Sequence, residues 1–310
     1  MLSPIHKNFL MGLLLMGLLG CSQNSSSPPN KGYSPTPSTA TGKIVIADIN
    51  KNASKKIQEF QPMADYLASH LTQFGIGTGE VKVAQDFETI ANWLKTGEVD
   101  LYFDSPYPAM RISQMSGAKP ILRRWKSRQG TYSGVIFIMA NSKINSVKDL
   151  QGKMIAFEEP VSTSGYVLPL NILLKAGLKT VEKSSTEQLV LSDEVGYVFS
   201  NDDENTIQWV ISGRVDAGAA DDRAFNSIPA QSRQEMKILA QTDKVARQIV
   251  LVKPGMNPEK QAAIKSILIN MDKTEAGKQV LETFEKTTKF DEYPVEADLK
   301  KLQEIYEKIN

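Results

Sequence analysis

The sequence predicts an α/β fold with two lobes of similar topology. From Lys43 onward, short β-branched runs alternate with longer segments of helical spacing, a nine-residue pattern occurs twice, and two strongly apolar strands lie between and after its copies. Strands separated by helices pair in parallel, because the crossover helix covers the sheet. We therefore expect each lobe to hold a mostly parallel sheet flanked by helices.

The predicted elements follow the same order in both lobes. In the first lobe, strands are expected over residues 44–47, 81–83 and 99–103, and helices over 54–71 and 87–94. In the second lobe, strands are expected over residues 154–157 and 215–219, and helices over 165–176 and 206–211. Pro62 is a local irregularity in the first helix. Gly97 and Gly177 are expected to end helices.

The repeated pattern reads W-[LV]-x-[TS]-G-x-V-D-[LA]. It covers residues 93–101 (WLKTGEVDL) and 209–217 (WVISGRVDA), which lie 116 residues apart. Physically it combines a helix end, a glycine and a buried strand. Such units are common, but two copies in similar surroundings indicate two lobes of like topology.

Two apolar segments, residues 132–140 and 248–252, are expected to cross between the lobes and form a two-segment hinge. This places the first lobe at residues 43–135 plus 245–310 and the second at residues 136–244. Residues 258–309 are expected to be mostly amphipathic helix.

Residues 1–21 have the organisation of an export signal. His6 and Lys7 form a weakly basic start, and the apolar run over residues 9–19 is too short to span a bilayer. The ending Leu18-Leu19-Gly20-Cys21 resembles the bacterial lipobox, which implies that Cys21 is acylated and becomes the mature N-terminus. The alternatives are a plain signal peptide with a chance cysteine and an uncleaved anchor.

Residues 22–42 are Ser, Pro, Thr and Asn with almost nothing to bury, so we expect a flexible tether. The protein is therefore expected in the periplasm or cell envelope, attached to a membrane by its lipid. Ser22 is not acidic, which in a Gram-negative cell favours the outer membrane.

Composition argues against several functions. The net charge is +1, aromatic residues make up 7%, and no basic–aromatic stripe occurs, so nothing points to nucleic acid. Two histidines and one cysteine are too few for a metal centre or an intrachain disulfide. No nucleophile elbow, zinc motif or dinucleotide fingerprint is present. We expect neither an enzyme nor a bound cofactor or metal.

Candidate ligand-binding residues follow the predicted strands, because open α/β sheets bind ligands beyond the carboxyl ends of their strands. Asp104, Ser105 and Tyr107 follow the third strand, and Asp221 ends the corresponding strand of the second lobe. Tyr107 either faces the cleft or packs on the surface. Asp104 and Asp221 either face each other across the cleft or cap the helices that follow them.

The strongest candidate is the run Ser162-Thr163-Ser164-Gly165, between a strand and a helix. The free N–H groups of a helix N-terminus and three hydroxyls suit a phosphate-like oxyanion. The alternative is a helix cap, for which Ser and Thr are favoured whether or not anything binds.

These residues together resemble the phosphate/phosphite/phosphonate ABC-transporter substrate-binding proteins, the PhnD-like family. The resemblance covers nearly all of residues 43–290. Its marks are FQPMADYL (60–67), GEVDL (97–101), SPY (105–107), SVKDLQGK (146–153), STSGY (162–166) with Pro169, and GRVDAG (213–218).

The resemblance implies a periplasmic-binding-protein fold of type II-like organisation. It further implies that Ser162, Thr163, Ser164, Tyr107 and Asp221 hold a small oxyanion, and that the protein delivers this ligand to an ABC-transporter permease. We expect a monomer, because closure of the cleft needs free lobes.

One position departs from the family pattern. Asp203 stands where the family often has a ligand-contacting His, and a carboxylate there repels an oxyanion. The acids Asp203 and Glu204 could instead bind an amine, or the ligand is another solute. Three further alternatives are a sensory lipoprotein acting on a membrane sensor kinase, a periplasmic hydrolase and a structural lipoprotein.

Overall fold

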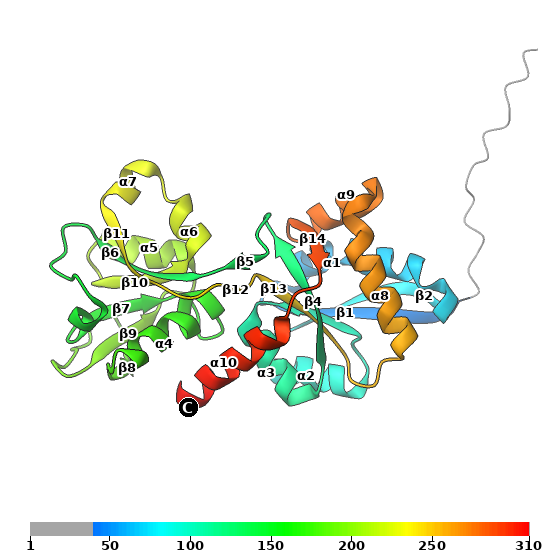
Figure 1. The fold of residues 1–310 in the computed structure, drawn as a ribbon, viewed down its shortest axis with the longest axis horizontal. Helices are drawn as coiled ribbons and strands as arrows, with labels where there is room; N and C mark the ends of the chain where they lie inside the picture. Colours follow the sequence, from blue (N-terminus) through cyan, green and yellow to red (C-terminus); the bar gives the residue numbers. More distant parts are fainter. Residues whose placement is uncertain (1–39, 310) are drawn as a thin grey trace, which may run out of the picture. The chain divides into compact units, whose positions relative to one another are not determined.

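The computed structural model describes residues 40–309, which form two six-stranded sheets with helices packed on them (Figure 1). The predicted export signal, Cys21 and most of the tether over residues 22–42 lie outside the described residues. Within residues 40–309, no helix is both long and apolar enough to cross a membrane.

The first sheet has the strand order β14-β4-β13-β3-β1-β2. Its strands are β1 (Gly42–Ile49), β2 (Ile76–Ala84), β3 (Leu101–Asp104), β4 (Lys119–Lys126), β13 (Gln248–Val252) and β14 (Thr287–Asp291). Its helices are α1 (Ala53–His70), α2 (Phe87–Thr96), α3 (Pro106–Ser116), α8 (Pro258–Asn270) and α9 (Glu275–Thr283), with 3₁₀ turns at Thr72–Phe74 and Met271–Lys273.

The second sheet has the order β11-β6-β10-β7-β9-β8. Its strands are β6 (Gly134–Met139), β7 (Met154–Phe157), β8 (Thr180–Glu182), β9 (Val195–Phe199), β10 (Ala217–Asp221) and β11 (Met236–Gln241). Its helices are α4 (Leu168–Lys175), α5 (Asp203–Ile211), α6 (Asp222–Ser227) and α7 (Ala230–Gln234), with a 3₁₀ turn at Val147–Leu150 and a π-helical turn, η3, at Thr163–Val167.

The predicted two-lobe α/β class is confirmed, but the sheets are more mixed than expected. In the first sheet only the pairs β1–β2 and β1–β3 are parallel, whereas β13 and β14 pair antiparallel with their neighbours. The chain returns to this sheet from the second lobe through β13, and a returning strand need not follow a crossover helix. The second sheet has three parallel pairs, β10–β7, β7–β9 and β8–β9.

Two predicted segments differ in detail from the structure. Residues 258–309 are mostly helix, as expected, but residues 287–291 form β14 and pair with β4. The helix expected over residues 165–176 is present, but its first turn is the π-helical turn η3, which precedes α4.

The repeated sequence pattern performs the same task in both lobes. In the first, the backbone N–H of Asp100 donates to the Val45 carbonyl (2.8 Å), and its carboxylate accepts from the Val45 N–H (2.9 Å). In the second, Asp216 makes the same two bonds to Met154, at 2.9 Å and 3.0 Å. The Val-Asp pair of each copy therefore ties the segment entering one strand to its parallel neighbour, β1 in the first lobe and β7 in the second.

The two lobes meet at a short antiparallel pair, β5 (Thr131–Tyr132) with β12 (Val245–Ala246), which lies between the sheets in Figure 1. The last helix, α10 (Val295–Ile309), attaches to this region. Asp298 of α10 accepts a hydrogen bond from the Ala246 N–H (2.6 Å). Apolar side chains of α10 share one buried cluster with Val167 and Leu168 of the second lobe, so α10 packs against both lobes.

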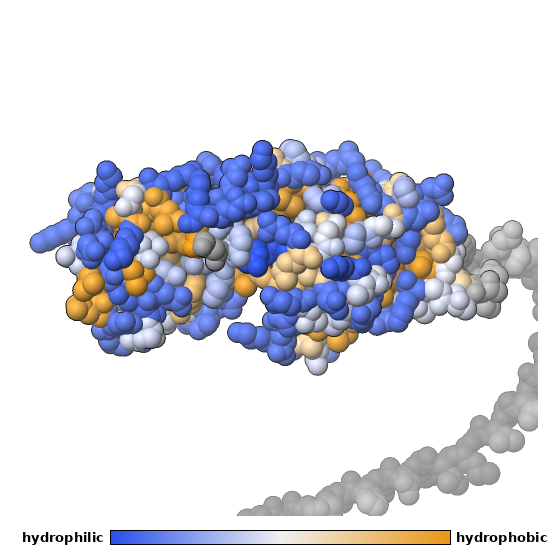
Figure 2. Space-filling view, turned by 90° about the horizontal axis from the view of Figure 1, so that it is seen from below, coloured by the Kyte–Doolittle hydropathy of each residue, from blue (hydrophilic) through white to orange (hydrophobic). Residues whose placement is uncertain are grey.

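Hydrophilic residues cover most of the face seen in Figure 2. The apolar side chains are concentrated in the clusters on either side of the two sheets. On one face of the first sheet, for example, Phe60 of α1 packs edge-on against Phe103 of β3 and Phe284 after α9. These packed sheets provide rigid supports for the loops at their edges.

Candidate ligand-binding site

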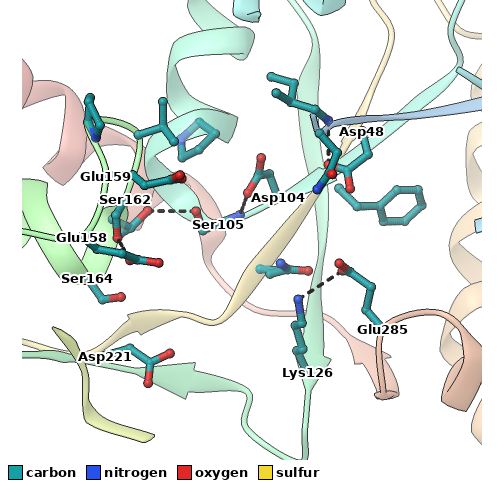
Figure 3. A pocket seen from close by; sticks show the side chains of 18 of the residues that line it. Asp48, Asp104, Ser105, Lys126, Glu158, Glu159, Ser162, Ser164, Asp221 and Glu285 are labelled. Carbon is teal, nitrogen blue, oxygen red and sulfur yellow. Dashed lines mark hydrogen bonds and ion pairs between the residues drawn. The ribbon is translucent and has the colours of Figure 1, made fainter. Parts of the chain in front are cut away.

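A cavity of about 830 Å³ lies where residues of both sheets meet. Four strands end at its wall: Asp48 belongs to β1, Asp104 ends β3, Glu158 follows β7 and Asp221 ends β10. The cavity therefore lies at the carboxyl ends of the parallel strands, where α/β sheets bind ligands. Figure 3 shows these side chains arranged around an open space.

The structure brings most of the sequence-predicted ligand residues to this wall. Those that line the cavity are Asp104, Ser105, Ser162, Thr163, Ser164, Asp203 and Asp221. Asp104 and Asp221 lie on different lobes, with the cavity between them, and Asp221 also caps α6 through the Ala224 N–H (2.6 Å).

Tyr107 is the exception among the predicted residues. It lies in the first turn of α3, 8% exposed, and its ring packs in the apolar cluster beside Tyr306, with ring centroids 6.2 Å apart. Only its backbone turns toward the site, where its N–H donates to the Thr163 hydroxyl (2.9 Å). The prediction that its side chain faces the cleft was wrong, because Pro106 and Pro108 start a helix whose buried face carries the ring.

The Ser162 hydroxyl is committed to partners within the protein. It accepts from the Gly165 N–H (2.9 Å), so it caps the helical turn, and it donates to the Glu158 carboxylate (2.5 Å). Gly165 is required by this close approach, since a Cβ there would lie 2.6 Å from the Glu158 Cβ. Ser162 is therefore a helix cap, the alternative role considered for it, and this cap lies at the wall of the cavity.

Thr163 is also engaged, and it links the lobes. Its hydroxyl accepts from the Tyr107 N–H and donates to the Ser105 hydroxyl (3.1 Å). Because Ser105 and Tyr107 belong to the first lobe, this side chain joins the two walls of the cavity. Thr163 is 1% exposed, so little of it is accessible from the cavity.

A third part of the wall comes from the segments that cross between the lobes. Burial raises the pKa of Tyr132 to about 12, and its hydroxyl contacts Thr163 and Ser164. The Arg247 guanidinium lies over the Tyr132 ring, 4.4 Å from the centroid, and reaches the Asp221 carboxylate at 3.4 Å. Among the described residues, Nε of Arg247 and Oε1 of the neighbouring Gln248 are buried without a hydrogen-bond partner.

The wall of the first lobe is a network of paired charges. Lys56 contacts the carboxylates of Asp48 (2.7 Å) and Glu285 (2.5 Å), and Lys126 and Arg124 also contact Glu285, at 3.2 Å and 2.8 Å. Burial raises the pKa of Glu285, but the three cations outweigh it and lower that pKa below its usual range. Burial raises the pKa of Asp48 to about 7, although Lys56 opposes the shift.

The wall of the second lobe gathers carboxylates instead. Burial, followed by the charges of Glu158 and Asp221, raises the pKa of Asp203 to about 8. Burial also raises the pKa of Glu158, although the Ser162 hydroxyl opposes the shift. In the described part of the chain, Asp203 Oδ1 is buried without a hydrogen-bond partner. Asp221 of this wall is paired with Arg247 and Arg223, whereas neither Glu158 nor Asp203 has an ion pair within residues 40–309.

Several residues of the cavity wall were not predicted from the sequence. Asp48 and Glu158 directly follow predicted strands, so their positions in the sequence indicated the binding site. Glu158 was not chosen as a ligand residue because adjacent acids such as Glu158 and Glu159 more often face solvent. Arg247 and Gln248 lie at the start of β13, which runs antiparallel to β3, with Ile249 opposite Asp104. They reach the cavity wall because β13 runs antiparallel to β3, which the sequence did not predict. No local sequence pattern marks Lys56 or Glu285 as residues of this wall.

The chain matches the family described as "ABC transporter, phosphonate, periplasmic substrate-binding protein" over residues 49–297. It belongs to this family. The family consists of transport substrate-binding proteins rather than enzymes, and its members act outside the cytoplasm. Within residues 40–309, no group of three or more His, Cys, Asp or Glu side chains is placed to hold a metal ion.

Three known proteins are similar to this chain. The "Phosphate-import protein PhnD" of Mycolicibacterium smegmatis is 26% identical over 185 residues, which is 57% of this chain and 56% of that protein. XAC2383 from Xanthomonas citri, solved with ATP, superposes with a TM-score of 0.79 at 24% identity, covering 86% of this chain and 99% of that one. PhnD1 from Prochlorococcus marinus, solved with methylphosphonate, has a TM-score of 0.62 at 19% identity, covering 86% and 98%. At these identities the two solved structures show a shared fold.

Proposed function

We propose that this protein captures a small phosphonate-, phosphite- or phosphate-like solute in the cavity between its lobes and delivers it to an ABC-transporter permease. The observation that carries the proposal is the family match over residues 49–297, which includes most of the cavity wall. A volume of about 830 Å³ is in the range of small-molecule sites.

The proposed contacts come from both lobes. Ser164 and the free Nε of Arg247 supply donors for ligand oxygens, while Ser162 and Thr163 hold the segment in place. Asp104, Ser105, Asp203 and Asp221 complete the wall. A ligand bridging the lobes stabilises their closed arrangement because its contacts with the second wall exist only on closure.

Binding is tested with the full chain purified in a mild detergent. Thermal shifts are recorded with phosphate, phosphite, methylphosphonate, 2-aminoethylphosphonate, arsenate and sulfate. A ligand at 100 times its Kd adds about 2.7 kcal/mol to the free energy of unfolding, which raises Tm by several degrees. A shift with a phosphorus compound, lost in Ser164→Ala, supports the proposal; no shift with any compound contradicts it.

We also propose that residues 43–135 plus 245–310 and residues 136–244 close as two lobes about the crossing segments β5–β6 and β11–β12. The pairing of β5 with β12 places both crossings side by side, as a two-segment hinge requires. Small-angle X-ray scattering with and without the ligand identified above should give a smaller radius of gyration in its presence. An unchanged radius would contradict closure.

The location and assembly of the protein complete the proposal. We propose that Cys21 carries the lipid anchor and that the protein acts as a monomer. Cys21→Ser should move the protein from the membrane fraction to the soluble fraction of cells, with Ser22→Ala as the control. Light scattering of the soluble Cys21→Ser protein should give the mass of one chain.

A further inference from the structure

We propose that helix α10 is a strap across the junction of the two lobes, and that its contact with the second lobe sets the population of the arrangement that binds ligand. The inference rests on the proposed closure of the lobes, because it assigns α10 a part in that movement. It goes beyond the ligand contacts, since none of the described residues of α10 lines the cavity.

The first anchor of α10 is on the first lobe. The Tyr306 ring lies beside the Tyr107 ring of α3, with centroids 6.2 Å apart, and the Arg111 guanidinium lies over Tyr306, 4.2 Å from its centroid. The buried apolar side chains of α10 belong to the same cluster as Tyr107; they are Val295, Leu299, Leu302 and Ile305. A helix held along its whole buried face moves with the lobe that holds it.

The second anchor is on the segment that crosses between the lobes. The buried Asp298 carboxylate accepts a hydrogen bond from the Ala246 N–H of β12 at 2.6 Å, and Lys301 contacts Asp243, just before β12, at 2.7 Å. The bond to Asp298 is the stronger tie, because the pair of Lys301 with Asp243 is exposed to solvent. Helix α10 therefore holds one of the two crossing segments at the point about which the lobes are proposed to close.

The third contact reaches the second lobe. Helix α10 runs from β14 toward α4 and lies against η3 and α4 (Figure 1). Val167 and Leu168 of these two elements are buried in the cluster that holds the apolar face of α10. Half-buried Ile309 packs against this cluster and also against a core cluster of the second lobe. This contact is smaller than the one with the first lobe, so it is the contact that separation of the lobes would break.

The strap lies directly behind the hydrogen bonds that join the lobes at the cavity wall. Thr163 bonds to Ser105 and to the Tyr107 N–H, Val167 follows Thr163 by one turn, and the Tyr107 ring packs beside α10. Movement of the second lobe away from α10 would break these bonds and expose Val167 and Leu168. Because burial of apolar surface is favourable, α10 stabilises the joined arrangement. A ligand that contacts both lobes binds this arrangement, so its apparent Kd falls as the joined population rises.

The test removes the contact with the second lobe and leaves the rest of α10 in place. Ile309→Ala is compared with Ile267→Ala, the matched control, whose half-buried side chain packs from α8 against a cluster of first-lobe residues only. Spin labels at two exposed positions, Lys95→Cys of α2 and Glu187→Cys of the second lobe, report the distance between the lobes in the full chain in detergent without ligand.

We expect Ile309→Ala to populate longer distances between the labels than the wild type does. It should also weaken binding of the ligand found in the thermal-shift series about fivefold, because the joined population falls. Ile267→Ala should change neither the distances nor the Kd, although it removes the same side chain. Thermal melting of both variants checks that they are folded.

A second pair of variants tests the anchor on the crossing segment. Asp298→Ala removes the acceptor of the Ala246 N–H and should also lengthen the distances, whereas Asp298→Asn keeps an acceptor oxygen and should preserve those of the wild type. Distances in Ile309→Ala and Asp298→Ala that equal the wild type, or shorter distances with tighter binding, overturn the strap and leave the proposed function standing. Longer distances in a protein that binds none of the thermal-shift compounds support the strap and overturn the proposed ligand class.

Discussion

The Ser162 hydroxyl donates to the Glu158 carboxylate across 2.5 Å while it accepts from the Gly165 N–H. One side chain thereby caps a helical turn and holds an acid at the cavity wall. The Ser162 hydroxyl, which was expected to face an anionic ligand, is turned instead toward this carboxylate.

Ser162→Ala should lower the free energy of unfolding by about 1 kcal/mol, because it removes a helix cap. Loss of the hydrogen bond to the ionised carboxylate should also raise the pKa of Glu158 further. Urea unfolding measures the first effect. Ser69→Ala is the control, since that exposed hydroxyl bonds only within its own helix and its neighbouring His70, and its removal should cost less. Equal losses would contradict the capping role.

Asp203→Asn should stabilise the protein at alkaline pH. The folded-state pKa of Asp203 is about 8, above the ordinary 3.8, because of burial and of Glu158 and Asp221, with Arg247 opposing. The folded protein therefore retains a proton that the unfolded chain releases, and this group makes stability fall as pH rises from about 4 to about 8. Asparagine cannot ionise, so the fall disappears.

The measurement is Tm of both proteins without ligand from pH 5 to pH 9. The gain of the variant over the wild type should be smallest at pH 5, grow as pH rises and level off on the order of 2 kcal/mol above pH 8, a figure reduced because solvent reaches part of the side chain. Asp193→Asn, 67% exposed at the surface, should show no such trend. A variant less stable than the wild type at pH 9 would refute the assignment.

Glu285→Gln should destabilise the first lobe by about 3–5 kcal/mol. It leaves Lys56, Arg124 and Lys126 around an uncharged group, and Arg124 is 0% exposed. Denaturant unfolding followed by tryptophan fluorescence gives the value. Glu292→Gln breaks the exposed pair with Lys265 and should cost less than about 1 kcal/mol. Similar costs for the two variants would contradict the importance of burial.

Gly134→Ala should impair ligand binding more than stability alone explains. A Cβ at this position, where β6 begins, would lie 2.2 Å from the Ser164 carbonyl oxygen and would push the Ser162–Ser164 segment out of place. Gly213→Ala is the matched control: its Cβ meets no atom of residues 40–309 within 4 Å, and only its positive φ of 69° makes the substitution costly. Titration with the ligand of the wild type should show weaker binding for Gly134→Ala alone.

The sequence by itself determined the alternation of strands and helices, and with it the two-lobe class. It also marked the ends of the parallel strands, where Asp104, Ser162 and Asp221 lie. The repeated Val-Asp pattern could also be recognised in the sequence, although the bonds of Asp100 to Val45 and of Asp216 to Met154 join positions 55 and 62 residues apart and were not predicted. The alternation and the strand ends depend on periodicity and on residues near one another in the chain.

Only the tertiary structure decided which side chains meet in the cavity and which charges remain unpaired there. Glu285 reaches Lys56 across 229 positions of sequence, and Gln248 enters the wall because β13 runs against β3. The Tyr107 side chain lies outside the site because its ring packs beside Tyr306 of α10 in a buried apolar cluster. Pairing and burial of charges depend on long-range packing, which no local sequence pattern encodes. The distribution of charge around the cavity could therefore be determined only from the folded structure.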